Sequence, residues 1–366
     1  MKDLIRAHAG LLIAGVATFV MMGAGQSLYG PALPAFSRIF AVSEAQAGVL
    51  VSAHWVGCFL GVAIMYLRGA GITPRHALAA MALGAAAVAA LAGWWATITG
   101  AVIFGLGYGL STAVFNPRVL RAFGRRGPSM LSLLNATFGV GAIAAPLIFV
   151  ALGSDPRLSF GLTAAFAAAI WLFAGPAGRE GVAQQAEVRT FRPHWGIMAF
   201  GAVAIGLEAS LIGLGPTALI RAGVAEKTAA ELLSAFFVVF LAARVVLIFF
   251  AHRIAPFLLY TLAVGAAAAC ALGAVFVSPS IFFVAMGASA GLFFPGFYVT
   301  ASGKMGEDIR VPPTIIASGL VGGIGAPLVL APMMAGMGDR GFFWIVAGVT
   351  LVLTAAAVLS LRRMKV

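Results

Sequence analysis

Long apolar runs alternate with short polar or Gly/Pro-rich breaks along the whole chain. With a window of about 19 residues the sequence shows twelve such runs. Each is long enough to cross a bilayer, where only helices satisfy all backbone hydrogen bonds without water. The pattern therefore predicts an all-α polytopic membrane protein with twelve transmembrane helices, at 10–34, 46–67, 76–95, 97–118, 129–152, 158–176, 195–221, 229–251, 254–275, 280–303, 312–335 and 340–361.

The two halves of the chain resemble each other. AGVLVSAHWVGCFLG from Ala47 aligns with AAELLSAFFVVFLAA from Ala229 at an offset of 182 residues, and APLI at 145 aligns with APLV at 326 at an offset of 181. Two matches in order at nearly one offset indicate a duplicated six-helix unit. We expect two pseudo-symmetric six-helix bundles, at 1–177 and 195–366, joined by a cytoplasmic linker at 178–194.

Composition excludes an ordinary water-soluble globular protein. The chain has 366 residues, of which 62% are hydrophobic and 9% charged, and its mean hydropathy is +1.05; soluble domains carry roughly a quarter charged residues. A net charge of +12 could indicate nucleic-acid binding if the basic residues were clustered on one face. The 23 Lys and Arg residues instead lie in short runs between apolar segments. We therefore expect no nucleic-acid partner.

The positive charges predict the orientation of the helices. With the N-terminus in the cytoplasm, 18 Lys and Arg residues lie on the inner side and 5 on the outer side, as the positive-inside rule requires. We expect a multi-pass protein of a bacterial-type plasma (inner) membrane with both termini cytoplasmic.

Strongly polar side chains occur on a subset of the predicted spans. A polar group that faces lipid is costly, so helices that carry one should line a water-filled interior. The strongly polar residues are Gln26, His54, Asn116, Asn135 and Glu208. Every third predicted helix carries nothing more polar than Ser, Thr or Tyr, which fits two bundles around a central cavity.

Several of these segments resemble the major facilitator superfamily and, within it, the fucose/galactose/glucose:proton symporter family. The similar segments are GQSLYGPALPAF, GLGYGLSTAVFNP and LSLLNATFGVGAIAAPLI in the first half, and GLEASLIGLGP, GLFFPGFYVTASG and ASGLVGGIGAPLVLAP in the second. The resemblance implies a secondary transporter that works by alternating access around a midplane site. It implies a small-molecule substrate, protons as coupling ions and contact with the lipid bilayer, and no enzyme activity, cofactor or metal; we expect a monomer.

The sequence departs from that family at the positions of its usual proton carriers. Fucose-type members place a carboxylate where Gln26 stands, and a glutamate shortly before the Asn116–Pro117 pair, where this chain reads Leu110, Ser111 and Thr112. The loop YLRGAGITPRHAL also lacks the acid that the superfamily has between helices 2 and 3. The proton must then bind elsewhere if transport is coupled.

Glu208 is the acid that remains near a midplane, since the other ten acids lie in loops, tails or helix ends. Without water a carboxyl group favours its neutral form, and it ionises when a wet cavity opens. A coupling proton requires this behaviour. A cationic-substrate ligand and a structural hydrogen-bonded glutamate are the alternatives.

Further candidate site residues follow from side-chain chemistry or from the family resemblance. His54 could relay a proton or donate to a sugar hydroxyl, or it could be a packed core histidine. Amides both donate and accept, which suits sugar hydroxyls or interhelical bonds, and aromatic rings stack on sugars. We expect Gln26, Tyr29, His54, Asn135 and Tyr298 to bind substrate, and Asn116, Pro117 and Arg244 to serve as gating or structural residues.

The leading function is proton-coupled uptake of a sugar or similar small polar solute. A proton-driven exporter of amphipathic or cationic compounds would also use a lone membrane glutamate and an aromatic cavity. An uncoupled facilitator, with Glu208 structural, is a further alternative. A membrane-embedded enzyme or receptor belongs to another class, for which the sequence offers no catalytic cluster.

Overall fold

The computed structural model describes residues 6–68, 71–175, 192–250, 253–306, 308 and 310–364. Within these residues the chain forms twelve long α-helices, the short 3-10 helix η2 and no strand, and eleven of the α-helices are long and apolar enough to span a bilayer. The all-α membrane architecture is confirmed. The elements are α2 (Ala9–Phe40), α3 (Glu44–Arg68), α4 (Pro74–Ala90), α5 (Trp94–Phe123), η2 (Gly124–Arg126), α6 (Gly127–Ala151), α7 (Pro156–Phe173), α8 (Trp195–Arg221), α9 (Glu226–Phe250), α10 (Pro256–Phe276), α11 (Pro279–Met305), α12 (Val311–Gly336) and α13 (Gly341–Ser360).

Proline and capping side chains mark where several helices begin. Pro156, Pro256 and Pro279 lie in first turns, where the N–H that proline lacks has no intrahelical partner. Asp155 precedes α7 and accepts a hydrogen bond from the backbone N–H of Arg157 at 2.7 Å. These local signals agree with the predicted breaks between spans.

Prolines inside the helices do not end them. The first span was expected at 10–34, but α2 continues to Phe40 with Pro31 and Pro34 in its interior. Membrane helices tolerate proline because neighbouring helices and local adjustments satisfy the freed carbonyl groups. Hydropathy marks the apolar part of a helix, so a helix that continues past its apolar run is longer than predicted.

The chain packs as two compact units. Met1–Ala41 and Ala53–Gln185 form the first, and Val42–Ser52 and Ala186–Val366 form the second, so that α3 starts in the second unit and continues in the first. The linker expected at 178–194 lies largely outside the described residues. The bundle boundaries at 177 and 195 therefore stay a prediction.

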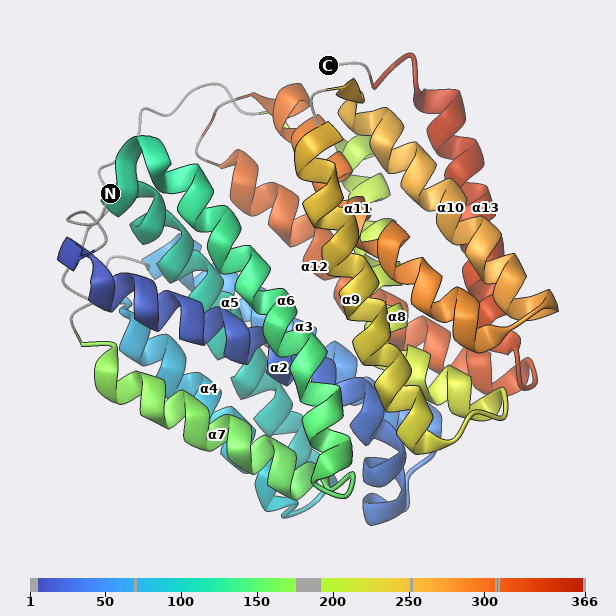
Figure 1. The fold of residues 1–366 in the computed structure, drawn as a ribbon, viewed down its shortest axis with the longest axis horizontal. Helices are drawn as coiled ribbons and strands as arrows, with labels where there is room; N and C mark the ends of the chain where they lie inside the picture. The colour runs from blue at the N-terminus through green and yellow to red at the C-terminus, as the bar shows by residue number, and fades with distance from the viewer. Residues whose placement is uncertain are drawn as a thin grey trace. The chain divides into compact units, whose positions relative to one another are not determined.

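Both units use the same helix pairings (Figure 1). In the first, α2 packs against α6, and α4 packs between α5 and α7. In the second, α8 packs against α12, and α10 packs between α11 and α13. Since α8 follows α2 by six helices, each pairing recurs in the second unit at the equivalent place in the chain.

A close helix crossing in the first unit is made by glycines of α5 on the backbone of α3. A Cβ atom on Gly105 would collide with the carbonyl oxygen of His54, and one on Gly109 would collide with that of Cys58. Small residues at this spacing let membrane helices approach to backbone contact. The crossing thereby fixes His54 against α5.

The second unit repeats this crossing 182 residues later. A Cβ on Gly287 of α11 would meet the carbonyl oxygen of Phe236 on α9, and one on Gly291 would meet that of Phe240. The offset agrees with the sequence repeat. The duplication thus extends from the sequence to individual backbone contacts.

Candidate functional site

Four rings from three helices gather around His54 in the first unit. The imidazole centroid lies 5.3 Å from that of Tyr29 on α2, 5.6 Å from Phe104 and 5.2 Å from Tyr108 on α5, and 5.4 Å from its neighbour Trp55. These separations and tilted or edge-on angles are those of favourable aromatic contacts. We call these five residues the ring cluster. It exists because the glycine crossing brings α3 and α5 together.

His54 is the polar residue at the centre of the ring cluster. It is 1% exposed, and neither ring nitrogen has a hydrogen-bond partner among the described residues. A buried polar atom without a partner costs about 1–3 kcal/mol. The imidazole is thus packed like a core residue. Its two nitrogens could still take part in proton transfer or in a hydrogen bond with a solute.

Gln26 borders the ring cluster on α2. The hydroxyl of Tyr108 donates to its Oε1 at 2.9 Å, and Trp55 meets Tyr108 edge-on at 6.2 Å. Gln26 is buried, whereas Trp55 and Tyr108 are partly exposed. Sequence reasoning did not single out Tyr108; its place four residues after Phe104, on the same helix face, is the signal that could have indicated it.

Tyr29 is placed deeper than a substrate contact would suggest. It is 1% exposed and packs between the rings of His54 and Phe160, which lies 5.2 Å away. Its hydroxyl is buried without a hydrogen-bond partner among the described residues. Tyr29 therefore supports the cluster from its core side.

Three further first-unit candidates lie apart from the ring cluster. Asn135 on α6 is exposed, and its amide donates to the Leu131 carbonyl of its own helix at 2.9 Å. Asn116 on α5 has a buried Oδ1 without a partner among the described residues, and Pro117 follows it on the exposed side. The structure brings none of the three to His54.

Glu208 lies at the middle of α8 in the second unit. It is partly buried, and its Oε2 is buried without a hydrogen-bond partner among the described residues. Arg244 of α9 is near enough to act electrostatically on the carboxylate. The second unit therefore contains a carboxyl group and a guanidinium group within its membrane-spanning helices.

Arg244 is held in place by α11. Its Nε donates to the carbonyl oxygen of Gly291 at 3.0 Å, and its guanidinium lies 4.3 Å from the ring centroid of Phe240. The helical partner of the Gly291 carbonyl would be the N–H of residue 295, which is Pro295 and has none. Arg244 thus supplies the donor that proline removes from α11.

Tyr298 also belongs to α11. It is partly exposed and lies against Phe294, with ring centroids 5.3 Å apart. It is one turn beyond Pro295, on the part of the helix that Arg244 supports. Its assignment to substrate stays a prediction, as do those of Gln26, Tyr29, His54 and Asn135.

The sequence model of the Major Facilitator Superfamily matches residues 15–329. The chain belongs to the Major Facilitator Superfamily. It is accordingly a multi-pass membrane transporter and not an enzyme. None of the curated proteins compared matches the sequence.

Solved structures of this superfamily share the fold. A nucleoside transporter, NupG, has a TM-score of 0.78 at 16% identity, with 96% of this chain and 98% of that chain covered. A D-xylose-proton symporter has 0.75 at 14%, covering 95% and 96%, and the E. coli fucose:proton symporter FucP has 0.65 at 19%, covering 95% and 98%. At these identities the likeness establishes the fold.

Proposed function

We propose that this superfamily member transports a small hydroxylated solute, such as a sugar, by proton-coupled alternating access with Glu208 as the proton carrier. The observation that carries the proposal is a carboxyl group at the middle of α8, near enough to Arg244 for an electrostatic interaction. One of its oxygens is buried without a hydrogen-bond partner in the part of the chain that the structure describes. The other described acids lie in turns or within the first two turns of a helix, namely Glu44, Asp155, Glu226, Glu231, Asp308 and Asp339.

The Glu208–Arg244 pair has two charge states that differ by one proton. With Glu208 ionised the two charges balance, whereas protonation leaves the positive charge of Arg244 without its counter-charge. Burial of an uncompensated charge costs much more than burial of a pair. Proton binding therefore changes which conformation the second unit favours, and coupling requires such a link.

The ring cluster is the proposed solute contact of the first unit. Trp55 and Tyr108 present partly exposed rings on which the apolar face of a sugar could stack. Gln26 and His54 add groups that donate to and accept from hydroxyls. The names of the similar structures, a nucleoside transporter, a D-xylose-proton symporter and a fucose:proton symporter, favour a hydroxylated ring as solute.

The test follows protons in proteoliposomes that contain a pH-sensitive dye. Sugars, nucleosides and organic cations are added in turn to the wild type, to Glu208→Gln and to the control Glu226→Gln, which removes an exposed carboxylate at the start of α9. We expect a hydroxylated solute to carry protons inward in the wild type and in Glu226→Gln, and no proton flux in Glu208→Gln.

Exchange of labelled solute separates coupling from binding. Glu208→Gln should abolish gradient-driven accumulation and keep exchange, because exchange need not release the proton. Loss of exchange in a folded Glu208→Gln protein would indicate that Glu208 binds the solute. Proton flux triggered only by organic cations, in the antiport direction, would indicate the exporter. Solute flux without proton movement in the wild type would indicate a facilitator.

We also propose that the protein lies in a bacterial-type inner membrane with both termini in the cytoplasm. The support is the asymmetry of basic residues, 18 against 5, between the two sides of the predicted spans.

A further inference from the structure

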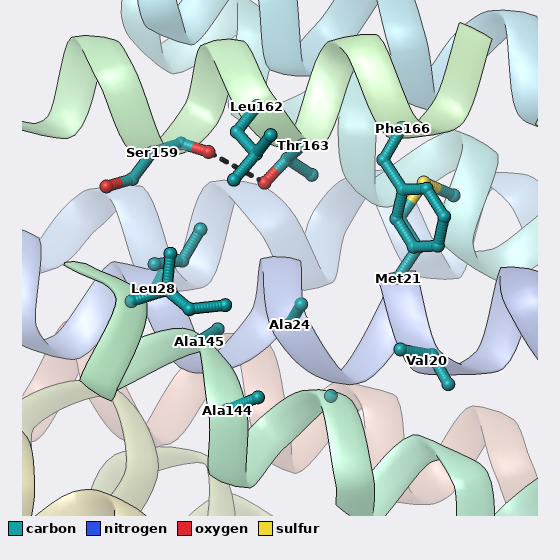
Figure 2. Close-up of a pocket in the computed structure, with 12 residues that line it drawn as sticks. Val20, Met21, Ala24, Leu28, Ala144, Ala145, Ser159, Leu162, Thr163 and Phe166 are labelled. Carbon is teal, nitrogen blue, oxygen red and sulfur yellow. Dashed lines mark hydrogen bonds between the residues drawn. The ribbon is translucent and has the colours of Figure 1, made fainter. Parts of the chain in front are cut away.

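An apolar cavity of about 360 Å³ lies between three membrane-spanning helices of the first unit and is open on one side, so we call it the groove (Figure 2). Helix α2 forms its floor, and α6 and α7 form its walls. Its volume falls within the range of ligand pockets, roughly 300–1,000 Å³. The lining includes Val20, Ala24, Leu28, Ala144, Leu162 and Phe166.

The polar groups of this groove are already satisfied by the chain. Ser159 Oγ donates to the carbonyl oxygen of Asp155 at 3.0 Å, and Thr163 Oγ1 donates to that of Ser159 at 2.9 Å. The other lining side chains carry no N–H or O–H group. Apolar cavities of this kind stay dry and accept apolar ligands.

The rim of the groove is on the outside of the unit. Ile148 on α6 is 43% exposed, and Leu162 and Phe166 on α7 are 52% and 39% exposed. In a membrane protein, a span face that exposes only apolar side chains is typical of lipid contact, because acyl chains are as apolar as leucine. We propose that the groove between α6 and α7 is a binding site for one phospholipid acyl chain, which lies against α2.

The second unit carries larger side chains at the equivalent positions of its sequence. At the repeat offset of 182, Leu162 corresponds to Trp344 and Thr163 to Ile345 on α13. Trp344 packs edge-on against Phe276, with centroids 5.3 Å apart. Since Leu162 lines the groove, a larger side chain at 162 should close it.

The groove also borders the tightest contact between α2 and α6. Gly141 lines the groove, and a Cβ on it would collide with the carbonyl oxygen of Val20. This crossing leaves no room for side chains between the two backbones. An acyl chain in the groove would thus contact both helices beside a fixed crossing, and α7 from the other side.

The experiment reconstitutes the full chain in phosphatidylcholine vesicles that contain a phosphatidylcholine with a diazirine in mid-chain. After illumination, lipid adducts are mapped by peptide mass spectrometry in the wild type, Leu162→Trp and Leu158→Trp. Leu158 is the matched control, because it lies on the same helix, is 51% exposed and does not line the groove. Both changes are at half-exposed positions, so the variants should fold, which size-exclusion chromatography and circular dichroism check.

We expect adducts at residues 141–148 and 159–166 to exceed severalfold those on the exposed face of α9, where Val246 is 54% and Phe249 66% exposed. Leu162→Trp should remove the excess, and Leu158→Trp should keep it. Equal labelling of the groove and of α9, or an excess that Leu162→Trp leaves unchanged, would overturn the proposal. Loss of the adducts when organic cations are added would also overturn it and assign the groove to a lipophilic solute.

Discussion

At the scale of single residues, the surroundings of Glu208 and Arg244 depend on how the helices of the second unit cross. Glu208 could be identified because a lone carboxylate in an apolar run is costly. Arg244 was expected to be a gating or structural residue, but its link to Gly291 and Pro295 depends on how α9 and α11 cross. Tyr108 was missed for the same reason, because its bond to Gln26 joins residues 82 positions apart.

The bond from Arg244 to Gly291 predicts a rescue. Arg244→Met should lower the free energy of unfolding by about 1–3 kcal/mol, because it leaves a buried carbonyl without a donor. Pro295→Ala restores a backbone N–H to α11, so the same change should cost clearly less in that background. Thermal unfolding of the four proteins in one detergent measures the coupling.

Additive costs for the two changes would contradict this role of Arg244. The coupling should appear in stability whether or not transport is lost, because Arg244 also acts on the charge of Glu208. Transport assays on the same four proteins therefore report the second role independently.

At the scale of helices, twelve apolar runs predicted twelve helices, and the error lay in where they end. Hydropathy follows the apolar runs, whereas α2 and α5 continue beyond the predicted ends, to Phe40 and Phe123. The repeat offset, taken from two short matches, also predicted which helices are equivalent. It could not predict that glycines of α5 and α11 rest on backbone carbonyls.

The glycine crossings predict equal sensitivity in both units. Gly105→Ala and Gly287→Ala should each lower the free energy of unfolding by about 1–3 kcal/mol, because the added Cβ overpacks a backbone contact. Gly348→Ala on α13, where the Cβ meets open space, should be neutral or stabilising. Melting temperatures in detergent compare the three; a Gly105→Ala protein as stable as the wild type would contradict the crossing.

At the scale of the whole molecule, the sequence predicted the superfamily, and the fold and the family match agree with it. The solute could not be predicted, because amides and rings suit many hydroxylated molecules. The acyl-chain groove could not be predicted either, since it depends on the space between α6 and α7. Such a space has no pattern along a chain in which most residues are apolar.

Orientation in the membrane is a further prediction at this scale. In a background of Cys58→Ala and Cys270→Ala, a cysteine placed at Arg157 should react with a membrane-impermeant maleimide added outside intact cells. Arg157 is in the first turn of α7, whereas Arg126 precedes the start of α6, one span away along the chain. A cysteine at Arg126 should react only after the membrane is opened. Both positions are exposed, so the reverse labelling would place the termini outside.

The repeated glycine crossings also bear on how such a chain can change over evolutionary time. Each unit carries its own set of backbone contacts, on His54 and Cys58 in one and on Phe236 and Phe240 in the other. Substitutions that keep the glycines leave those contacts in place. After duplication, one copy could therefore acquire a carboxylate at 208 while the other carried an amide at 26. Proton chemistry and solute recognition could then diverge in two units whose helix crossings are kept by the same glycine contacts.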